Sequence, residues 1–171
     1  NGVVCAKMNH MSYIDGTGTV VWEIDTAIVD PILKVDGNYI LIAEKGRNKI
    51  CLYIDNKLQY DVDDPDTVMS AELSSNGDVV VVTDKSSYRG GISVYNKSGE
   101  QIFSWASGSD AVICADISAA SRSVAVALLN SDVTAKTTVQ LFNVNETESY
   151  AKIEMPDTVV YELQFVGDKV N

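Results

Sequence analysis

The chain has 171 residues, 46% of them hydrophobic, which is enough to bury a sizeable core, roughly 70% of the surface that the unfolded chain exposes. Its 24 acidic and 13 basic residues give a formal net charge of −11 at pH 7, and this negative field repels polyanions. The composition therefore predicts a globular protein and excludes nucleic acids as partners.

No apolar run approaches the roughly 20 residues that a membrane-spanning helix needs, and no signal peptide opens the chain. The chain begins at Asn1 rather than at a methionine and ends at VGDKVN, directly after a turn signal. We expect a soluble portion of a longer protein, with any membrane segment outside this chain.

Short runs rich in Val, Ile, Leu, Tyr and Thr follow one another, separated by clusters of Gly, Asn, Asp and Ser. The first are GVVCAKMN, MSYIDG and VVWEID. Residues 39–45, 49–55 and 57–63 then predict three consecutive strands, with GRN and DN as the turns between them. Because almost no helical periodicity interrupts this pattern, it predicts an all-β fold.

The residues that follow repeat this plan twice, as VMSAELSSNGD, VVVVTDK, GISVYNKSGE and QIFSWAS, and then as VICADISAASR, SVAVALLNSD, TTVQLFNVNE and SYAKIEMPD. The apolar residue before the first turn of each unit recurs at intervals of roughly 40 to 50 residues. These register marks are Val35, Leu73, Ile117 and Phe165. Four strands per repeat at this period predict a β-propeller, in which each small antiparallel sheet, or blade, buries its faces against its neighbours.

About four blades are visible, so we expect residues 1–171 to be a single β-propeller domain that forms part of a larger propeller. The expected boundaries are a partial blade at 1–30, complete blades at 31–66, 67–109 and 110–157, and a partial blade at 158–171.

Two glycine turns and the aromatic residues after them recur in different blades. Gly18 in GTGTVVWE and Gly99 in KSGEQIFSW are expected to form tight turns with positive φ before the outermost strand. Trp22, Phe103 and Trp105 then supply large flat side chains that can fill the space between blades. The continuously apolar runs VVVV and VAVALL, at 79–82 and 124–129, are typical of strands that are covered on both faces.

The segments GTVVWEID, VDGNYILIAEKGRNKICLYI, ISVYNKSGEQIFSW and ADISAASRSVAVALLNSD resemble DUF5711, a family of bacterial propellers of unknown function with PQQ-like and WD40-like repeats. The resemblance covers essentially the whole chain. It implies an extracytoplasmic propeller at the cell envelope, tethered to the membrane by an N-terminal helix that lies outside this chain. It implies no reaction.

His10 is the only histidine, so any catalytic triad or dyad that uses a histidine depends on it. On an uninterrupted strand Cys5 and His10 would point to opposite faces, because they are an odd number of residues apart. We therefore interpret His10 as an ordinary surface or packing residue and expect no metal site. Cys5, Cys51 and Cys114 are expected to be buried free thiols.

The run YDVDDPDT places four carboxylates close together, at Asp61, Asp63, Asp64 and Asp66, and a set of hard oxygen ligands could bind calcium. It lacks the glycine turn and the later carboxylate of a calcium loop, so a solvated loop between blades is the favoured interpretation. EKGRNK and DKSSYRGG are interpreted as hairpin turns rather than phosphate loops.

Two hypotheses about function remain. The first is a non-catalytic scaffold or recognition module that binds a protein or a cell-wall glycan through the turns of an acidic ring, with no cofactor and no catalytic residues assigned. The alternative is an enzyme, a hydrolase, lyase or quinone-dependent dehydrogenase, with its site at the central channel. Tyr13, Asp15, Asp84 and Arg89 are the residues to inspect for that alternative.

Overall fold

The structure, a computed structural model, describes residues 2–120, 122–132, 134–166 and 169–170. Every regular element that it describes is a β-strand, and no helix in this part of the chain could cross a membrane. Strands β1 to β7 are Gly2–Lys7, His10–Asp15, Val20–Asp25, Pro31–Asp36, Tyr39–Glu44, Lys49–Ile54 and Lys57–Asp63. Strands β8 to β12 are Thr67–Leu73, Val79–Asp84, Gly91–Tyr95, Gln101–Ala106 and Ala111–Ile117. Strands β13 to β17 are Ser123–Asn130, Lys136–Asn143, Ser149–Pro156, Phe165–Val166 and Lys169–Val170.

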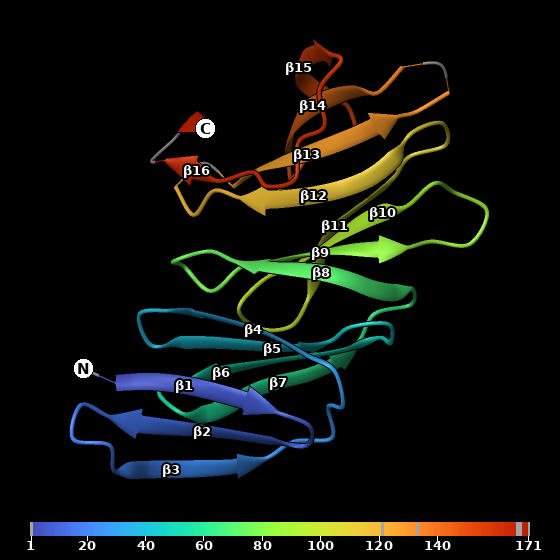
Figure 1. Cartoon of the computed structure of the whole chain (residues 1–171). Helices are drawn as coiled ribbons and strands as arrows, with labels where there is room; N and C mark the ends of the chain where they lie inside the picture. Colours follow the sequence, from blue (N-terminus) through green and yellow to red (C-terminus); the bar gives the residue numbers. More distant parts are fainter. Residues whose placement is uncertain (1, 121, 133, 167–168, 171) are drawn as a thin grey trace.

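The strands form antiparallel sheets in which sequence neighbours pair. Sheet 1 contains β1–β3, and sheets 2, 3 and 4 are four-stranded and contain β4–β7, β8–β11 and β12–β15. Strands β16 and β17 form a short hairpin. The four larger sheets follow one another from the blue N-terminal end to the orange C-terminal end (Figure 1). The predicted all-β architecture of four-stranded antiparallel propeller blades, forming part of a propeller, is confirmed.

The first strand of each four-stranded sheet lies against the sheet before it. Strand β12 contacts β8 and β9, β8 contacts β4 and β5, and β4 contacts β1. We call β4, β8 and β12 the inner strands. The register marks occupy equivalent places, because Val35 pairs with Ile40, Leu73 with Val79 and Ile117 with Val124 in the ladder to the second strand.

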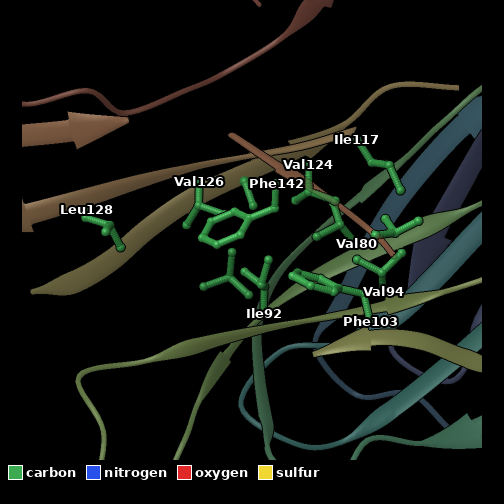
Figure 2. Packing of buried hydrophobic residues seen from close by; sticks show 12 residues of the cluster. Val80, Ile92, Val94, Phe103, Ile117, Val124, Val126, Leu128 and Phe142 are labelled. Atoms are coloured by element: carbon green, nitrogen blue, oxygen red, sulfur yellow. The ribbon is translucent and has the colours of Figure 1, made fainter. Parts of the chain in front are cut away.

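Hydrophobic side chains from facing sheets fill the space between them. Figure 2 shows this packing between sheets 3 and 4, where Phe103 and Phe142 place their ring centroids 5.8 Å apart. Trp105 packs against the same cluster, 5.0 Å from the Phe142 ring, and Trp22 packs in the equivalent cluster between sheets 1 and 2. The predicted role of these aromatic side chains between blades is confirmed. Residues 79–82 are buried throughout, as expected for a strand covered on both faces.

The two glycine turns have the same construction. Gly18 has φ +83° and Gly99 has φ +84°, a region that glycine enters without steric cost. Gly18 N–H donates to the Asp15 carbonyl at 3.0 Å, and Gly99 N–H donates to the Asn96 carbonyl at 2.9 Å. The side chains of Asp15 and Asn96 also accept backbone N–H bonds from the residues two and four positions later. Both turns therefore join the third strand of a blade to the fourth.

The three cysteines are free thiols, but they are not all buried as expected. Cys51 is buried and Cys114 is half-buried, but Cys5 is exposed. Burial raises the pKa of the Cys51 thiol to about 12 and that of Cys114 to about 11, so both remain protonated at neutral pH. The prediction for Cys5 was wrong because it assumed that both faces of β1 are covered. Among the described residues no sheet precedes sheet 1.

Candidate functional site

The ends of the inner strands bring charged side chains together. Lys34, Glu72 and Asp116 each stand one residue before a register mark. Neighbouring residues of a strand point to opposite faces, so Glu72 and Asp116 point away from the packed clusters to which Leu73 and Ile117 belong. Lys34 Nζ donates to Glu72 Oε1 at 2.7 Å and thereby links sheet 2 to sheet 3.

The carboxylates at this site are partly desolvated. Burial raises the pKa of Glu72 above its usual range, although the bond from Lys34 opposes this, and the charges of Asp116 and Glu162 raise it further. Burial also raises the pKa of Asp116, although its Oδ2 accepts the backbone N–H of Phe165 at 2.6 Å. The negative charge is therefore only partly compensated by the protein itself.

These residues line a cavity of about 280 Å³, which we call the axial cavity. Its walls are the ends of the inner strands and the segment 162–165. The charged groups around it are the carboxylates of Asp36, Glu72, Asp116 and Glu162, with the Lys34–Glu72 ion pair at one side. The remaining polar lining consists mainly of serine side chains. Such a cavity favours a cationic group over an anionic one.

The described residues do not form a metal centre, because no group of three or more His, Cys, Asp or Glu side chains among them is placed to hold an ion. His10, which the sequence analysis interpreted as an ordinary residue, lies on sheet 1. Its Nδ1 is 3.2 Å from Asp25 Oδ1 and its Nε2 is 3.4 Å from Glu23 Oε1. It is not among the residues that line the axial cavity.

The premise of an uninterrupted strand between Cys5 and His10 was wrong. The chain turns at Met8 and Asn9, so Cys5 belongs to β1 and His10 to β2. Cys5 pairs with Ser12 in the ladder, whereas His10 pairs with Lys7.

The acidic run of residues 61–66 is divided among separate partners. Lys49 Nζ lies 2.6 Å from Asp61 and 3.6 Å from Asp63, while Lys85 Nζ lies 2.9 Å from Asp66. Asp64 is only 1% exposed and accepts hydrogen bonds from Tyr95 Oη at 2.7 Å and from the Asp66 backbone N–H at 2.8 Å. The expectation of a fully solvated loop was therefore wrong for Asp64, which helps to connect sheets 2 and 3.

The four residues named for an enzymatic site lie in different places. Tyr13 stacks on Trp22, with ring centroids 6.0 Å apart, in a groove of about 680 Å³ between sheets 1 and 2. Asp15 holds the glycine turn after β2. Asp84 and Arg89 line two further hollows, one each. The structure therefore does not bring these four side chains into one site.

Sequence reasoning did not identify Glu72 and Asp116, although a signal for them was present. Each precedes a register mark, so in an otherwise apolar strand it is an ionisable residue on the face opposite the packed side chain. Glu162 could not be found in this way because it stands three residues before Phe165 rather than one.

Comparison with known proteins gives a family match over the whole chain. The model of the family described as "Family of unknown function (DUF5711)" matches residues 1–171. A search of curated proteins found no match.

Solved structures resemble the chain in fold, at low sequence identity. BBS1N, crystallised in complex with ARL6DN, has a TM-score of 0.66 at 15% identity, over 96% of this chain and 53% of that one. BamB from Moraxella catarrhalis has a TM-score of 0.62 at 14% identity, over 88% of this chain and 45% of that one. The dihydro-heme d1 dehydrogenase NirN has a TM-score of 0.61 at 16% identity, over 95% of this chain and 36% of that one. The chain thus spans about half the length of BBS1N and BamB, and less of NirN.

Proposed function

Because the chain belongs to the DUF5711 family, whose function is unknown, we propose a function from the site itself: a non-catalytic β-propeller module that binds a protein partner. The axial cavity receives a basic segment of that partner, with lysine or arginine side chains placed among the carboxylates. The packed sheets are the rigid scaffold that holds these carboxylates in place.

One observation carries this proposal, namely the four carboxylates around the axial cavity, of which Glu72 and Asp116 are half-buried. Burial raises the pKa of the Glu72 and Asp116 carboxyl groups, as expected where charged forms are only partly compensated within the protein. A cationic side chain that enters the cavity would supply this compensation. The formal net charge of −11 also favours the approach of a basic partner, since long-range attraction accelerates association.

A binding role is favoured over an enzymatic one by the chemistry of the cavity lining. It contains carboxylates and serines, while His10 lies elsewhere, on sheet 1. A serine nucleophile needs an adjacent base to activate it. The likeness to NirN concerns the fold, and fold alone does not determine function.

We further propose that the protein works outside the cytoplasm at the cell envelope, tethered through an N-terminal helix beyond this chain. The resemblance to the family supports this location. Accessibility of the tagged full-length protein to protease added outside the cell tests it. Protection until the membrane is permeabilised would contradict it.

Titration with an oligo-arginine peptide, followed by calorimetry, tests the binding proposal. We expect saturable binding that weakens as salt is added, because exposed charges are screened. The double variant Glu72→Gln and Asp116→Asn should raise the dissociation constant at least about tenfold, since it removes both half-buried charges of the cavity. An oligo-glutamate peptide of equal length should not bind.

The matched control removes two carboxylates elsewhere. Glu146 and Glu148 are exposed in the loop between β14 and β15, so the double variant Glu146→Gln and Glu148→Gln has the same net charge as the site variant. Its affinity should stay within about twofold of the wild-type value. Equal weakening by the two double variants would mean that the peptide responds to overall charge only, and this would refute the axial site.

A further inference from the structure

A second polar cavity, of about 370 Å³, lies between sheets 2 and 3, which are complete four-stranded blades in the middle of the chain (Figure 1). We call it the interblade hollow. Its polar lining consists of Arg47, Asn48, Asp66, Thr67, Asp84 and Ser86. Thr67 is the first residue of β8, whereas Leu73, which lines the axial cavity, is the last. The two cavities therefore lie at opposite ends of this strand.

The hairpin between β5 and β6 forms one wall of the hollow and is held firmly against the next blade. Gly46 N–H donates to the Val68 carbonyl at 2.8 Å, and Val68 N–H donates to the Arg47 carbonyl at 2.6 Å. Asp64 N–H donates to the Asn48 carbonyl at 2.8 Å. The backbone of Arg47 and Asn48 is thus fixed before any ligand arrives, and such preorganisation lowers the entropic cost of binding.

Glu44 orients the side chain of Arg47. Glu44 Oε1 accepts the Val29 N–H at 3.0 Å and lies 3.6 Å from Arg47 Nε. The side chain of Glu44 is only 7% exposed, whereas that of Arg47 is 70% exposed. No other carboxylate among the described residues pairs with Arg47. The two terminal amino groups of its guanidinium can therefore bind a carboxylate through two parallel hydrogen bonds.

The two aspartates of the hollow differ in how their charge is compensated. Asp66 Oδ2 accepts a hydrogen bond from Lys85 Nζ at 2.9 Å. Asp84 is exposed and forms no ion pair within the part of the chain that the structure describes. Arg47 and Asp84 thus place opposite charges in one cavity without pairing with each other. A molecule that carries both charges would complement this arrangement.

A hollow in the equivalent place between sheets 3 and 4 provides an internal comparison. There Asn130 Nδ2 donates to Asp110 Oδ1 at 2.7 Å, just as Lys85 donates to Asp66. Arg89 also lines this hollow and belongs to the connection between the second and third strands of its blade. The two hollows therefore share the same framework.

They differ in the residue pair that begins the ladder between the inner strand and the second strand. This pair is Thr67 and Asp84 in sheet 3, but Ala111 and Leu129 in sheet 4. The volume is about 370 Å³ in the first case and about 60 Å³ in the second. Packing between blades is thus possible with an apolar pair and little space. The polar pair and the larger volume between sheets 2 and 3 favour a binding role.

We propose that the interblade hollow binds a small zwitterion of the α-amino-acid class. Its carboxylate binds the guanidinium of Arg47, and its ammonium group binds the carboxylate of Asp84. The amide of Asn48 and the hydroxyl groups of Thr67 and Ser86 are neutral hydrogen-bonding groups, and they favour a polar, uncharged side chain on the ligand. This site is separate from the axial cavity and takes a different class of ligand.

Titrations of the isotope-labelled chain with L-glutamine and with L-serine, followed by NMR, test the proposal. We expect saturable shifts of the backbone amide signals of Asn48 and Ser86 with at least one of the two. The N-acetyl derivative of that amino acid lacks the ammonium group, and its α-amide lacks the carboxylate. Each should bind at least about tenfold more weakly, because one charged group of the hollow loses its partner. Absence of saturable shifts with both amino acids, or equal binding by the derivatives, would overturn the proposal.

Substitutions at the two charged residues locate the site. Arg47→Gln and Asp84→Asn should each raise the dissociation constant at least about tenfold. Arg89→Gln and Asp132→Asn, at the equivalent hollow, change the net charge by the same amounts and should leave it within about twofold. Circular dichroism checks that the variants are folded. Site variants that bind like the wild type, or controls that weaken binding equally, would contradict the assignment. The double variant of the axial cavity should bind the amino acid normally, so the two proposals can fail separately.

Discussion

Tyr95 Oη donates a 2.7 Å hydrogen bond to Asp64 Oδ2 between sheets 2 and 3, and both residues are buried. The bond joins the third strand of one blade to the loop that leaves the blade before it. Burial raises the pKa of Tyr95, and the hydrogen bond to Asp64 raises it further, so the phenol stays a donor at physiological pH. A buried carboxylate is thereby compensated by a neutral donor.

Tyr95→Phe should therefore lower the free energy of unfolding by about 1 to 3 kcal/mol, because it removes a partner from a buried charge. Asp64 would keep only the backbone N–H of Asp66 among the two bonds described above. Urea unfolding at pH 7 measures the effect. Tyr88→Phe, at an exposed tyrosine, is the control and should change stability by less than about 0.5 kcal/mol. Equal effects of the two substitutions would mean that the bond contributes nothing.

Phe142 is the centre of the packing between sheets 3 and 4, since both Phe103 and Trp105 contact its ring. Phe142→Ala should cost about 3 to 5 kcal/mol, because the side chain is fully buried and its removal leaves a cavity between the sheets. Thermal and urea unfolding, monitored by tryptophan fluorescence, measure the loss. A cost below about 1 kcal/mol would show that the neighbouring sheets close over the gap, contrary to close packing.

The strands and the register marks could be predicted because they depend on local pattern. Val35, Leu73 and Ile117 precede turns and belong to apolar runs, so their equivalence was visible before their pairing was known. The exposure of Cys5 and the burial of Asp64 could not be predicted in this way. Each depends on which residues of a neighbouring sheet lie opposite the side chain. The alternation of residues along one strand does not specify these neighbours.

The candidate site illustrates the same limit. A polar residue before a register mark is visible in the sequence at Glu72 and Asp116, but its proximity to Glu162 depends on how neighbouring blades are placed around the axis. The repeat pattern predicts that consecutive blades contact each other. The site, however, combines residues from several blades, and the pattern does not specify how these residues meet. Only the arrangement in space shows that these carboxylates influence one another.

The two glycine turns form a matched pair for separating backbone strain from steric overlap. Both glycines have φ close to +84°, but a Cβ at Gly99 would lie 2.9 Å from Tyr60 Cγ, whereas a Cβ at Gly18 would meet no atom within 4 Å. Gly18→Ala should cost about 1 to 2 kcal/mol from the left-handed backbone alone. Gly99→Ala should cost about 1 kcal/mol more, from overlap with the tyrosine. Denaturant unfolding of both variants measures the difference, and equal costs would show that Tyr60 moves away freely.

The raised pKa values of Asp116 and Glu72 predict how stability changes with pH. Since folding raises the pKa of Asp116, its stabilising contribution is present below the unfolded value near 4 and is lost as the pH rises through the folded value. Asp116→Asn removes this loss, so the stability of the variant relative to the wild type should increase from pH 4 to pH 7. Urea unfolding at pH 4, 5.5 and 7 measures it, with Asp132→Asn as an exposed control that should show no such trend. Parallel pH curves for wild type and Asp116→Asn would show that the charge of Asp116 is fully compensated, which would also remove the observation that supports a basic partner.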